Sequence, residues 1–343
     1  MGVGAGLQAI INTSYSPSII LLSYLFLGER MGGVQILGVV LILNAVLSVG
    51  WMGGPRSELP RRTLAAGILF GIGVLGAIDM EWLWDQIVAI WRANNCIAGG
   101  DTNCSEANTA MFMAGGMTSK DVPHVMAALA RAISAARTMV AYECGATGPT
   151  KDCAYEDPII KAMTGVPIST EGKTSACAHS DLAGNLIGAV CDLWSNEAVE
   201  YHDMFGATTT SVFAEILGYD CAMFNTAIEL GYQEQLKEIL VNSDMYRDSH
   251  SLIVAPNNAW EIGNAIVSNR DKSNYASARA GAIKAGQIIL GDAKMKLTAL
   301  EKKALDAAMK DLEALPDAEG DFIQQCLDKY KDVKGFNSAS YGL

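Results

Sequence analysis

Two long apolar stretches open the chain. Residues 7–27 read LQAIINTSYSPSIILLSYLFL, and residues 34–52 read VQILGVVLILNAVLSVGWM without a charged residue. The second stretch is long enough to cross a bilayer core of about 30 Å. The polar residues and Pro17 of the first stretch are tolerated in a span that packs on other helices. The pattern predicts a transmembrane helical hairpin over residues 1–52, with a pair of helices buried in a globular core as the alternative.

A linker follows the hairpin at residues 53–63. Its sequence, GGPRSELPRRT, contains glycines, prolines and charges that break both helix and strand. By the positive-inside rule, its arginines lie on the cytoplasmic side of a membrane. We therefore expect residues 64–343 to be cytoplasmic, with membrane association through residues 7–52.

From Asp79 onward the pattern is that of a globular α/β domain. Apolar residues recur at helical spacing over 79–95 and again over 121–141. The short apolar run at 96–101 ends at glycines, as a buried strand does. Later helices are expected at 181–193, 209–230, 233–242, 258–268, 275–291, 298–314 and 319–331. The final four are rich in Ala, Lys, Asp and Glu, which predicts a solvated helical tail at the C-terminus.

Charge and cysteine usage narrow the classes of function. The net charge is −12 and the chain has no basic cluster. This excludes nucleic-acid binding, which needs clustered Lys and Arg to neutralise phosphates. The eight cysteines are dispersed without a C-x-x-C pair, which is typical of reduced thiols in a cytoplasm.

Three stretches gather groups that can carry chemistry. They are GGDTNC at 99–104, KDCAYED at 151–157 and GKTSACAHSD at 172–181. A glycine-ended apolar run followed by polar groups is how a barrel strand delivers side chains to its catalytic rim. A thiol–imidazole pair or zinc site is one interpretation of Cys177 and His179, and a structural histidine is the commoner one. A free cysteine is also most often a small buried hydrophobe. Spacing alone therefore indicates only an α/β domain with candidate thiol ligands.

Long strings after residue 64 resemble the B subunit of methanol–corrinoid methyltransferases. They are DMEWLWDQIV, GGDTNCSEANTAM, GPTKDCAYEDPIIKAMTGVPISTEGKTSACAH, CDLWSNEAVEY and YDCAMFNTA. The resemblance implies a TIM-type (β/α) barrel with extra C-terminal helices over residues 64–343. It also implies an enzyme that moves the methyl group of methanol to the cob(I)alamin of a partner corrinoid protein. Such an enzyme serves methanol-dependent methanogenesis or related one-carbon metabolism, in an oligomeric complex with the corrinoid protein.

In that family one Glu and two Cys hold a zinc ion, Zn²⁺. Carried over by motif, the two cysteines are Cys104 and Cys153. Thiolates keep zinc bound, and an open fourth position accepts the alcohol. The flanking residues Asp101, Asn103, Tyr155 and Glu156 are expected to support the zinc ligands or contact the substrate.

The N-terminal part departs from that family. SPSIILLSYLFLGER and QILGVVLILNAVL resemble the last two helices of an EamA-type drug/metabolite transporter. Counting back from the cysteines places the family's zinc-binding Glu near Ser48, where no acidic residue stands. We therefore expect a partial barrel with open edges, weak zinc binding, and little or no activity from this chain. The alternatives are a membrane-anchored degenerate domain and an EamA-type transporter fragment.

Overall fold

The structure is a computed structural model, and it describes only part of the chain. The described residues are 80–96, 98, 107, 110, 111, 114, 122–146, 155–168, 170, 172, 173, 184–195, 197 and 211–332. All of them belong to a unit that spans Leu64–Leu343. The predicted hairpin and linker lie outside these residues. No helix within the described ranges is both long enough and apolar enough to cross a bilayer.

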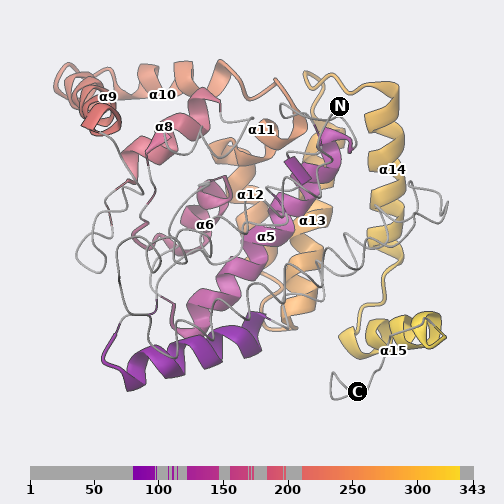
Figure 1. Cartoon of the computed structure of the whole chain (residues 1–343). Coiled ribbons are helices and arrows are strands. Elements are labelled where there is room, and N and C mark those ends of the chain that lie inside the picture. Colours follow the sequence, from indigo (N-terminus) through magenta and orange to yellow (C-terminus); the bar gives the residue numbers. More distant parts are fainter. Residues whose placement is uncertain are drawn as a thin grey trace, which may run out of the picture. The chain divides into compact units, whose positions relative to one another are not determined.

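A long alanine-rich helix, α5 (His124–Cys144), forms the centre of the described core. Its Ala127, Ala128, Ala132 and Ala135 are fully buried, and these small side chains let neighbouring helices approach closely. The helix ends at Gly145, which adopts a left-handed conformation with φ 106°. Such a conformation suits glycine because it has no Cβ. Figure 1 shows α5 in magenta beside the orange helix α13 (Asn274–Gly291).

Three further helices pack around α5 and α13. They are α6 (Asp157–Thr164), α11 (Ser249–Val254) and α12 (Pro256–Val267). Helix α12 packs on both α6 and α13, and α11 packs on α5. One apolar cluster joins all of these helices, with Ile159, Leu252 and Ile262 fully buried. This cluster positions the ends of α6 and α11, where the polar groups described below lie.

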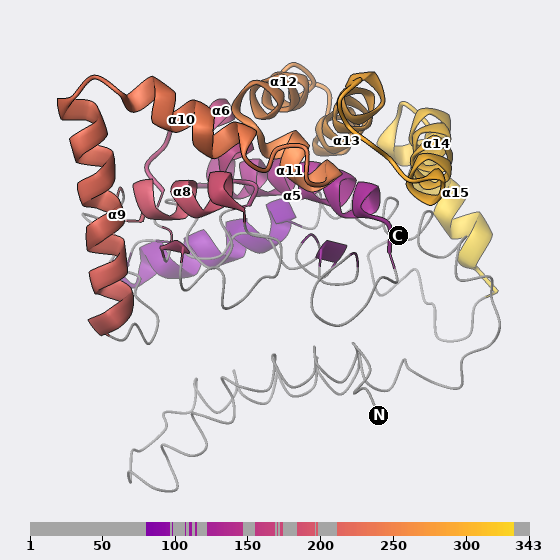
Figure 2. The ribbon, with the colours of Figure 1, turned by 90° about the horizontal axis from the view of Figure 1, so that it is seen from above.

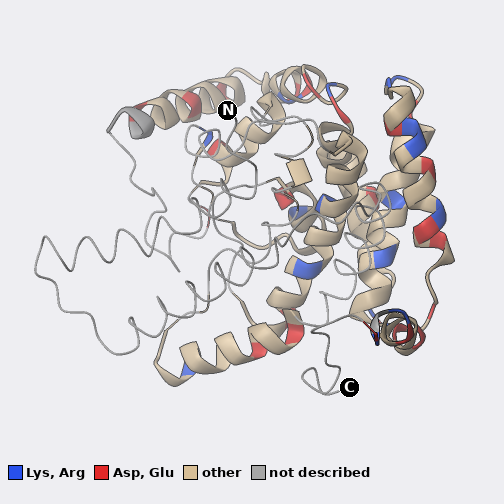
Figure 3. Cartoon of the chain, turned by 45° about the vertical axis from the view of Figure 1, so that its right-hand side comes forward, with Lys and Arg blue, Asp and Glu red and all other residues tan. Residues whose placement is uncertain are grey.

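The C-terminal helices are not all a solvated tail, which corrects the expectation from composition. In α13, Tyr275, Ala278, Ala282 and Ala285 are fully buried against α5 and α12. The composition of α13 did not predict its burial, because a face of alanine and glycine packs closely without the large apolar residues that mark a buried helix. Only α14 (Ala299–Ala314) and α15 (Glu319–Tyr330) are markedly charged, and Figure 3 shows acidic and basic residues mixed along them.

Helices α8 (Asn185–Leu193), α9 (Ser211–Glu229) and α10 (Gln233–Asn242) lie at one side of the described part. Figure 2 shows α9 and α10 meeting at a sharp corner. Gly231 lies in the connection with φ 75°, a value that L side chains rarely adopt. Large apolar side chains on this pair face solvent, among them Tyr219, Ile228 and Ile239.

Most predicted helices are confirmed within a few residues. Helix α10 has the predicted bounds, and residues 80–93 are helical as expected. Helices α6 and α11 were missed, although Asp157-Pro158 is a helix-start signal and Asp248 caps α11 by accepting from the Ser251 N–H. No strand occurs among the described residues. Of the strand predicted at 96–101, only residues 96 and 98 are described, and neither belongs to a helix or a strand.

Candidate active site

Two of the predicted site residues fall in the described part, and both are buried. Tyr155 has no exposed surface, and Glu156 is 5% exposed. The other predicted residues lie outside the described residues: Asp101, Asn103, Cys104, Cys153, Cys177 and His179. Tyr155 and Glu156 follow the KDCA stretch directly, so they are the described residues nearest to Cys153 in the sequence on its C-terminal side.

Glu156 forms a buried ion pair with Arg131 of α5. The Arg131 Nη1 atom lies 2.5 Å from Glu156 Oε2, and the side chains are 0% and 6% exposed. Removing one partner of such a pair leaves an uncompensated buried charge, which typically costs about 3–5 kcal/mol. The pair therefore ties the turn before α6 firmly to the middle of α5.

His250 of α11 contacts the same arginine. Arg131 Nε donates to His250 Nε2 over 3.0 Å. A ring nitrogen that accepts carries no proton, so the imidazole is neutral with its proton on Nδ1. Burial, followed by the positive charge of Arg131, lowers the pKa of His250 to about 3. The nearby carboxylate of Asp248 opposes this shift but does not reverse it.

The Tyr155 ring completes this group. Its centroid lies 5.1 Å from the guanidinium carbon of Arg131, a cation–π distance. The ring also meets His250 edge to face, with centroids 5.5 Å apart. We call Arg131, Tyr155, Glu156 and His250 the Arg131 cluster. It joins α5, the turn before α6, and α11, three elements that are distant in sequence.

Sequence reasoning missed half of this cluster. Arg131 and His250 are not among the site residues predicted from the sequence, and the hydrogen bond between them joins α5 to α11. A usable signal existed, because Arg131 interrupts the apolar run HVMAALARAI, in which every residue from Val125 to Ile133 is buried. A charge within a buried helix face requires a partner.

The third predicted stretch contributes a separate polar group around Lys173. The Lys173 N–H donates to Asp192 Oδ1 over 2.8 Å, and Lys173 Nζ lies 2.5 Å from Asp220 Oδ2. Burial, helped by the neighbouring Asp220, raises the pKa of Asp192 to about 6. This group links α8 to α9 and contains no thiol or imidazole among its described members.

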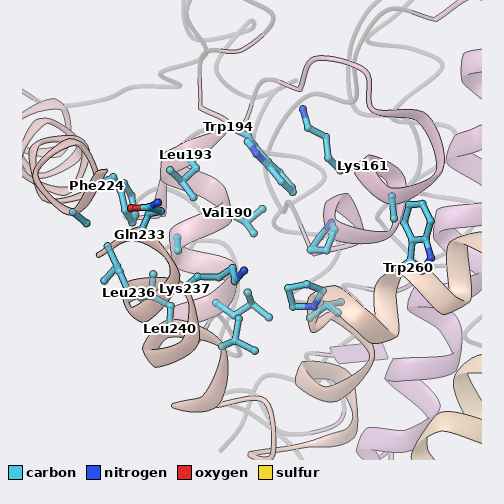
Figure 4. A pocket seen from close by; sticks show the side chains of 18 of the residues that line it. Lys161, Val190, Leu193, Trp194, Phe224, Gln233, Leu236, Lys237, Leu240 and Trp260 are labelled. Carbon is cyan, nitrogen blue, oxygen red and sulfur yellow. The ribbon is translucent and has the colours of Figure 1, made fainter. Parts of the chain in front are cut away.

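An apolar cavity of about 440 Å³ is lined in part by Pro158, Lys161 and Ala162 of α6 (Figure 4). Its walls come from α6 and from α8 to α12, and they include Trp194, Leu236 and Trp260. Lys161 at its edge pairs with Glu197. Among the described residues, the lining has no cysteine, histidine or carboxylate that could bind a metal.

The donor set fits zinc only in part. Two thiols are suitable ligands, but a catalytic zinc site needs three protein ligands and an open position. No group of three His, Cys, Asp or Glu side chains gathers within the described ranges. In the Arg131 cluster, Arg131 occupies His250 Nε2 and one oxygen of Glu156. A complete site therefore needs a further ligand from elsewhere in this chain or from another molecule.

Comparisons with known proteins identify the fold. The crystal structure of the methanol:cobalamin methyltransferase complex MtaBC from Methanosarcina barkeri matches with a TM-score of 0.69 and 48% sequence identity. That match covers 82% of this chain and 62% of the solved chain. The fold therefore matches that solved structure, which is a TIM barrel.

The family follows from the sequence comparisons. A family model described as methanol-cobalamin methyltransferase B subunit matches residues 45–342. The methanol–corrinoid protein co-methyltransferase of Methanosarcina barkeri (strain Fusaro / DSM 804) is 47% identical over 309 residues, covering 87% of this chain. The chain belongs to the methanol–cobalamin methyltransferase B subunit family. It spans 66% of the length of that curated relative.

These matches also correct the expected N-terminal boundary. The family match begins at residue 45, whereas the resemblance was expected to begin near Leu64. It takes in the end of the second apolar stretch and all of the predicted linker. The comparisons give no support to an EamA-type transporter hairpin over residues 7–50.

Proposed function

We propose that this chain acts in transferring the methyl group of methanol to the cob(I)alamin of a partner corrinoid protein. The family membership over residues 45–342 supports the proposal. A relative 47% identical to this chain is named as a methanol–corrinoid protein co-methyltransferase, and the similar solved structure is a complex named MtaBC. We extend the proposal to a comparable complex of this chain with a corrinoid protein.

Zinc is the cofactor in this proposal, and Cys104 and Cys153 are its ligands. When bound, zinc supplies Lewis acidity toward the oxygen of methanol. The two thiolates of this chain hold the metal, and a third ligand completes the site. Tyr155 and Glu156 follow Cys153 by two and three positions; both are buried and Glu156 is hydrogen-bonded to Arg131, which is the support that a metal-ligating loop requires.

The Arg131 cluster has a supporting part in the proposed reaction. Arg131 donates to the free nitrogen, Nε2, of His250 and pairs with Glu156, so neither side chain is arranged as a general base. The positive charge of Arg131 balances the negative charge of Glu156 within the cluster. The cluster therefore keeps the turn after Cys153 in place and shields it from water, because all four side chains are buried.

The zinc proposal is tested by metal analysis of the purified chain after dialysis against zinc. The Cys104→Ser and Cys153→Ser variants are the tests, and Cys96→Ser is the matched control because Cys96 is an exposed free thiol. We expect the wild type and Cys96→Ser to retain zinc equally and both test variants to lose most of it. Equal zinc in all four proteins would contradict the ligand assignment.

The membrane hairpin over residues 7–52 stays a prediction, because those residues lie outside the described part. Fractionation of cells that express the native protein, followed by a carbonate wash, measures it directly. An integral hairpin keeps the chain in the washed membrane pellet. Recovery of the whole chain in the supernatant would contradict the hairpin.

A further inference from the structure

The Arg131 side chain on α5 contacts two other segments, the Tyr155–Glu156 turn and α11. Its Nη1 atom binds the Glu156 carboxylate, and its Nε atom binds His250 on α11. Its guanidinium carbon lies 5.1 Å from the centroid of the Tyr155 ring. Glu156 lies 25 positions after Arg131 in the sequence, and His250 lies 119 positions after it. One fully buried side chain therefore adds a polar link between α5, the Tyr155–Glu156 turn and α11, which also pack together through the apolar cluster.

We propose that Arg131 is a positioning residue for the stretch that carries Cys153. It holds the Tyr155–Glu156 turn between α5 and α11 and thereby fixes where the preceding residues can lie. This inference rests on the proposed function only for what Cys153 does, namely hold the metal. The positioning itself follows from the contacts of Arg131.

The backbone makes this anchoring effective. The Glu156 carbonyl accepts from the N–H groups of Ile159 and Ile160, at 2.9 and 3.0 Å, so the turn is continuous with the start of α6. Glu156 is thus held by its side chain and by its backbone. Three residues of extended chain span at most about 10–11 Å, so a fixed Glu156 confines Cys153 to its neighbourhood.

The energetics of buried ion pairs indicate that the Arg131–Glu156 pair serves to position the turn more than to stabilise the fold. Replacing such a pair with well-packed apolar residues is often neutral or stabilising. The hydrogen bonds of the pair are directional, however, and they select one arrangement of the turn among several that an apolar contact would allow. Stability alone therefore gives no reason for an arginine at position 131.

The chemistry of the guanidinium explains why lysine would not serve. A planar guanidinium donates in two directions and stacks on a ring at the same time. A lysine ammonium keeps the charge, but it cannot hold the Glu156 carboxylate and the His250 nitrogen while also covering the Tyr155 ring. Arg131→Lys therefore keeps the positive charge and the ion pair with Glu156, but it loses the simultaneous contacts with His250 and the Tyr155 ring.

The test compares Arg131→Lys and Arg131→Met with Arg279→Met in the full chain. Arg279 is a fair control because it also makes several hydrogen bonds, to the carbonyls of Leu312 and Glu313 and to Asp317. Those contacts join α13 to the end of α14 and do not involve the Tyr155–Glu156 turn. The first readout is hydrogen exchange of the peptide 147–160 in metal-free protein. The second is Co²⁺ affinity, followed by the thiolate-to-cobalt absorption band.

We expect faster exchange in peptide 147–160 for both Arg131 variants, with peptides from α13 and α14 unchanged. We also expect Co²⁺ affinity to fall by about 10–100-fold, as for the loss of a group that supports a metal ligand. Arg279→Met should show neither change, although its thermal stability also falls. If Arg131→Met does not fold, Arg131→Lys, which keeps the charge, decides the question.

Two results would overturn the inference. One is unchanged exchange of peptide 147–160 in the Arg131 variants. The other is equal effects of the Arg131 and Arg279 substitutions, which would show a general loss of stability. Failure of the wild type to bind Co²⁺ through thiolates is a distinct result. It would overturn the proposed zinc site, while the exchange measurement would still decide whether Arg131 positions the turn.

Discussion

Replacing Gly281 by alanine tests how closely α12 and α13 approach each other. A Cβ atom at position 281 would lie 2.8 Å from Cγ1 and 3.1 Å from Cδ1 of Ile266. It would also lie 3.5 Å from the carbonyl oxygen of Ala132. Ile266 is fully buried and β-branched, so its side chain has little freedom to move away. The new methyl group therefore overpacks the core.

Two opposing terms determine the magnitude. Alanine is favoured over glycine in a helix interior by about 1 kcal/mol. Overpacking a dense core costs typically about 1–3 kcal/mol. We therefore expect Gly281→Ala to lower the free energy of unfolding by up to about 2 kcal/mol, which is the difference between these two terms.

Gly218→Ala is the matched control. Gly218 lies within α9, and a Cβ there meets no atom within 4 Å. Only the propensity term acts at this position, so we expect a gain of about 1 kcal/mol. Urea unfolding followed by circular dichroism measures both variants against the wild type. If Gly281→Ala gains as much stability as Gly218→Ala, the close approach of α12 and α13 is wrong.

Three further outcomes are expected. The pKa of His250 is about 3, against its usual value near 6.5, so between these values the unfolded chain binds a proton that the native chain does not. The contribution of His250 to stability is therefore fully present above pH 6.5 and falls below it by up to about 1.4 kcal/mol per pH unit. The raised pKa of Asp192 acts in the opposite direction. The difference in unfolding free energy between the wild type and His250→Gln, measured with urea at several pH values, should show the His250 slope, and a constant difference would contradict it. Thr298→Ala removes a capping box with Glu301 and should cost about 1 kcal/mol, measured by the shift of the urea midpoint; no shift would contradict the cap. Alkylation followed by peptide mapping should modify exposed Cys96 quickly and buried Cys191 slowly in the native protein, and equal rates would contradict the packing of α8.

Local patterns predicted the helices but not how deeply they are buried. The periodicity of 233–242 gave α10 its correct bounds, and the helix limits of α13 were close. The burial of α13 was not foreseen, because its buried face consists mainly of Ala and Gly. Such a face becomes a core only when a partner such as α5 supplies equally small residues. That complementarity is tertiary, and a single sequence does not display it.

The candidate site was predicted in a similarly partial way. The KDCAYED stretch drew attention to Tyr155 and Glu156, which the structure places in a buried polar cluster. Arg131 and His250 could not be assigned to the same cluster, because they come from helices far away in the chain. Resemblance to known sequences assigned Cys104 and Cys153 to zinc, whereas spacing gave no more than candidate thiols.

Methyl transfer from deuterated methanol tests the central claim most directly. The chain is loaded with zinc, mixed with the corrinoid protein in its cob(I)alamin state and CD₃OH, and the corrinoid is then analysed by mass spectrometry. The account predicts a CD₃ group on the corrinoid with the wild type and with Cys96→Ser, formed slowly because no acidic residue stands near Ser48 to supply the family's third zinc ligand, and none with Cys153→Ser. An unlabelled corrinoid with zinc-loaded wild type, or equal labelling with Cys153→Ser, would contradict it.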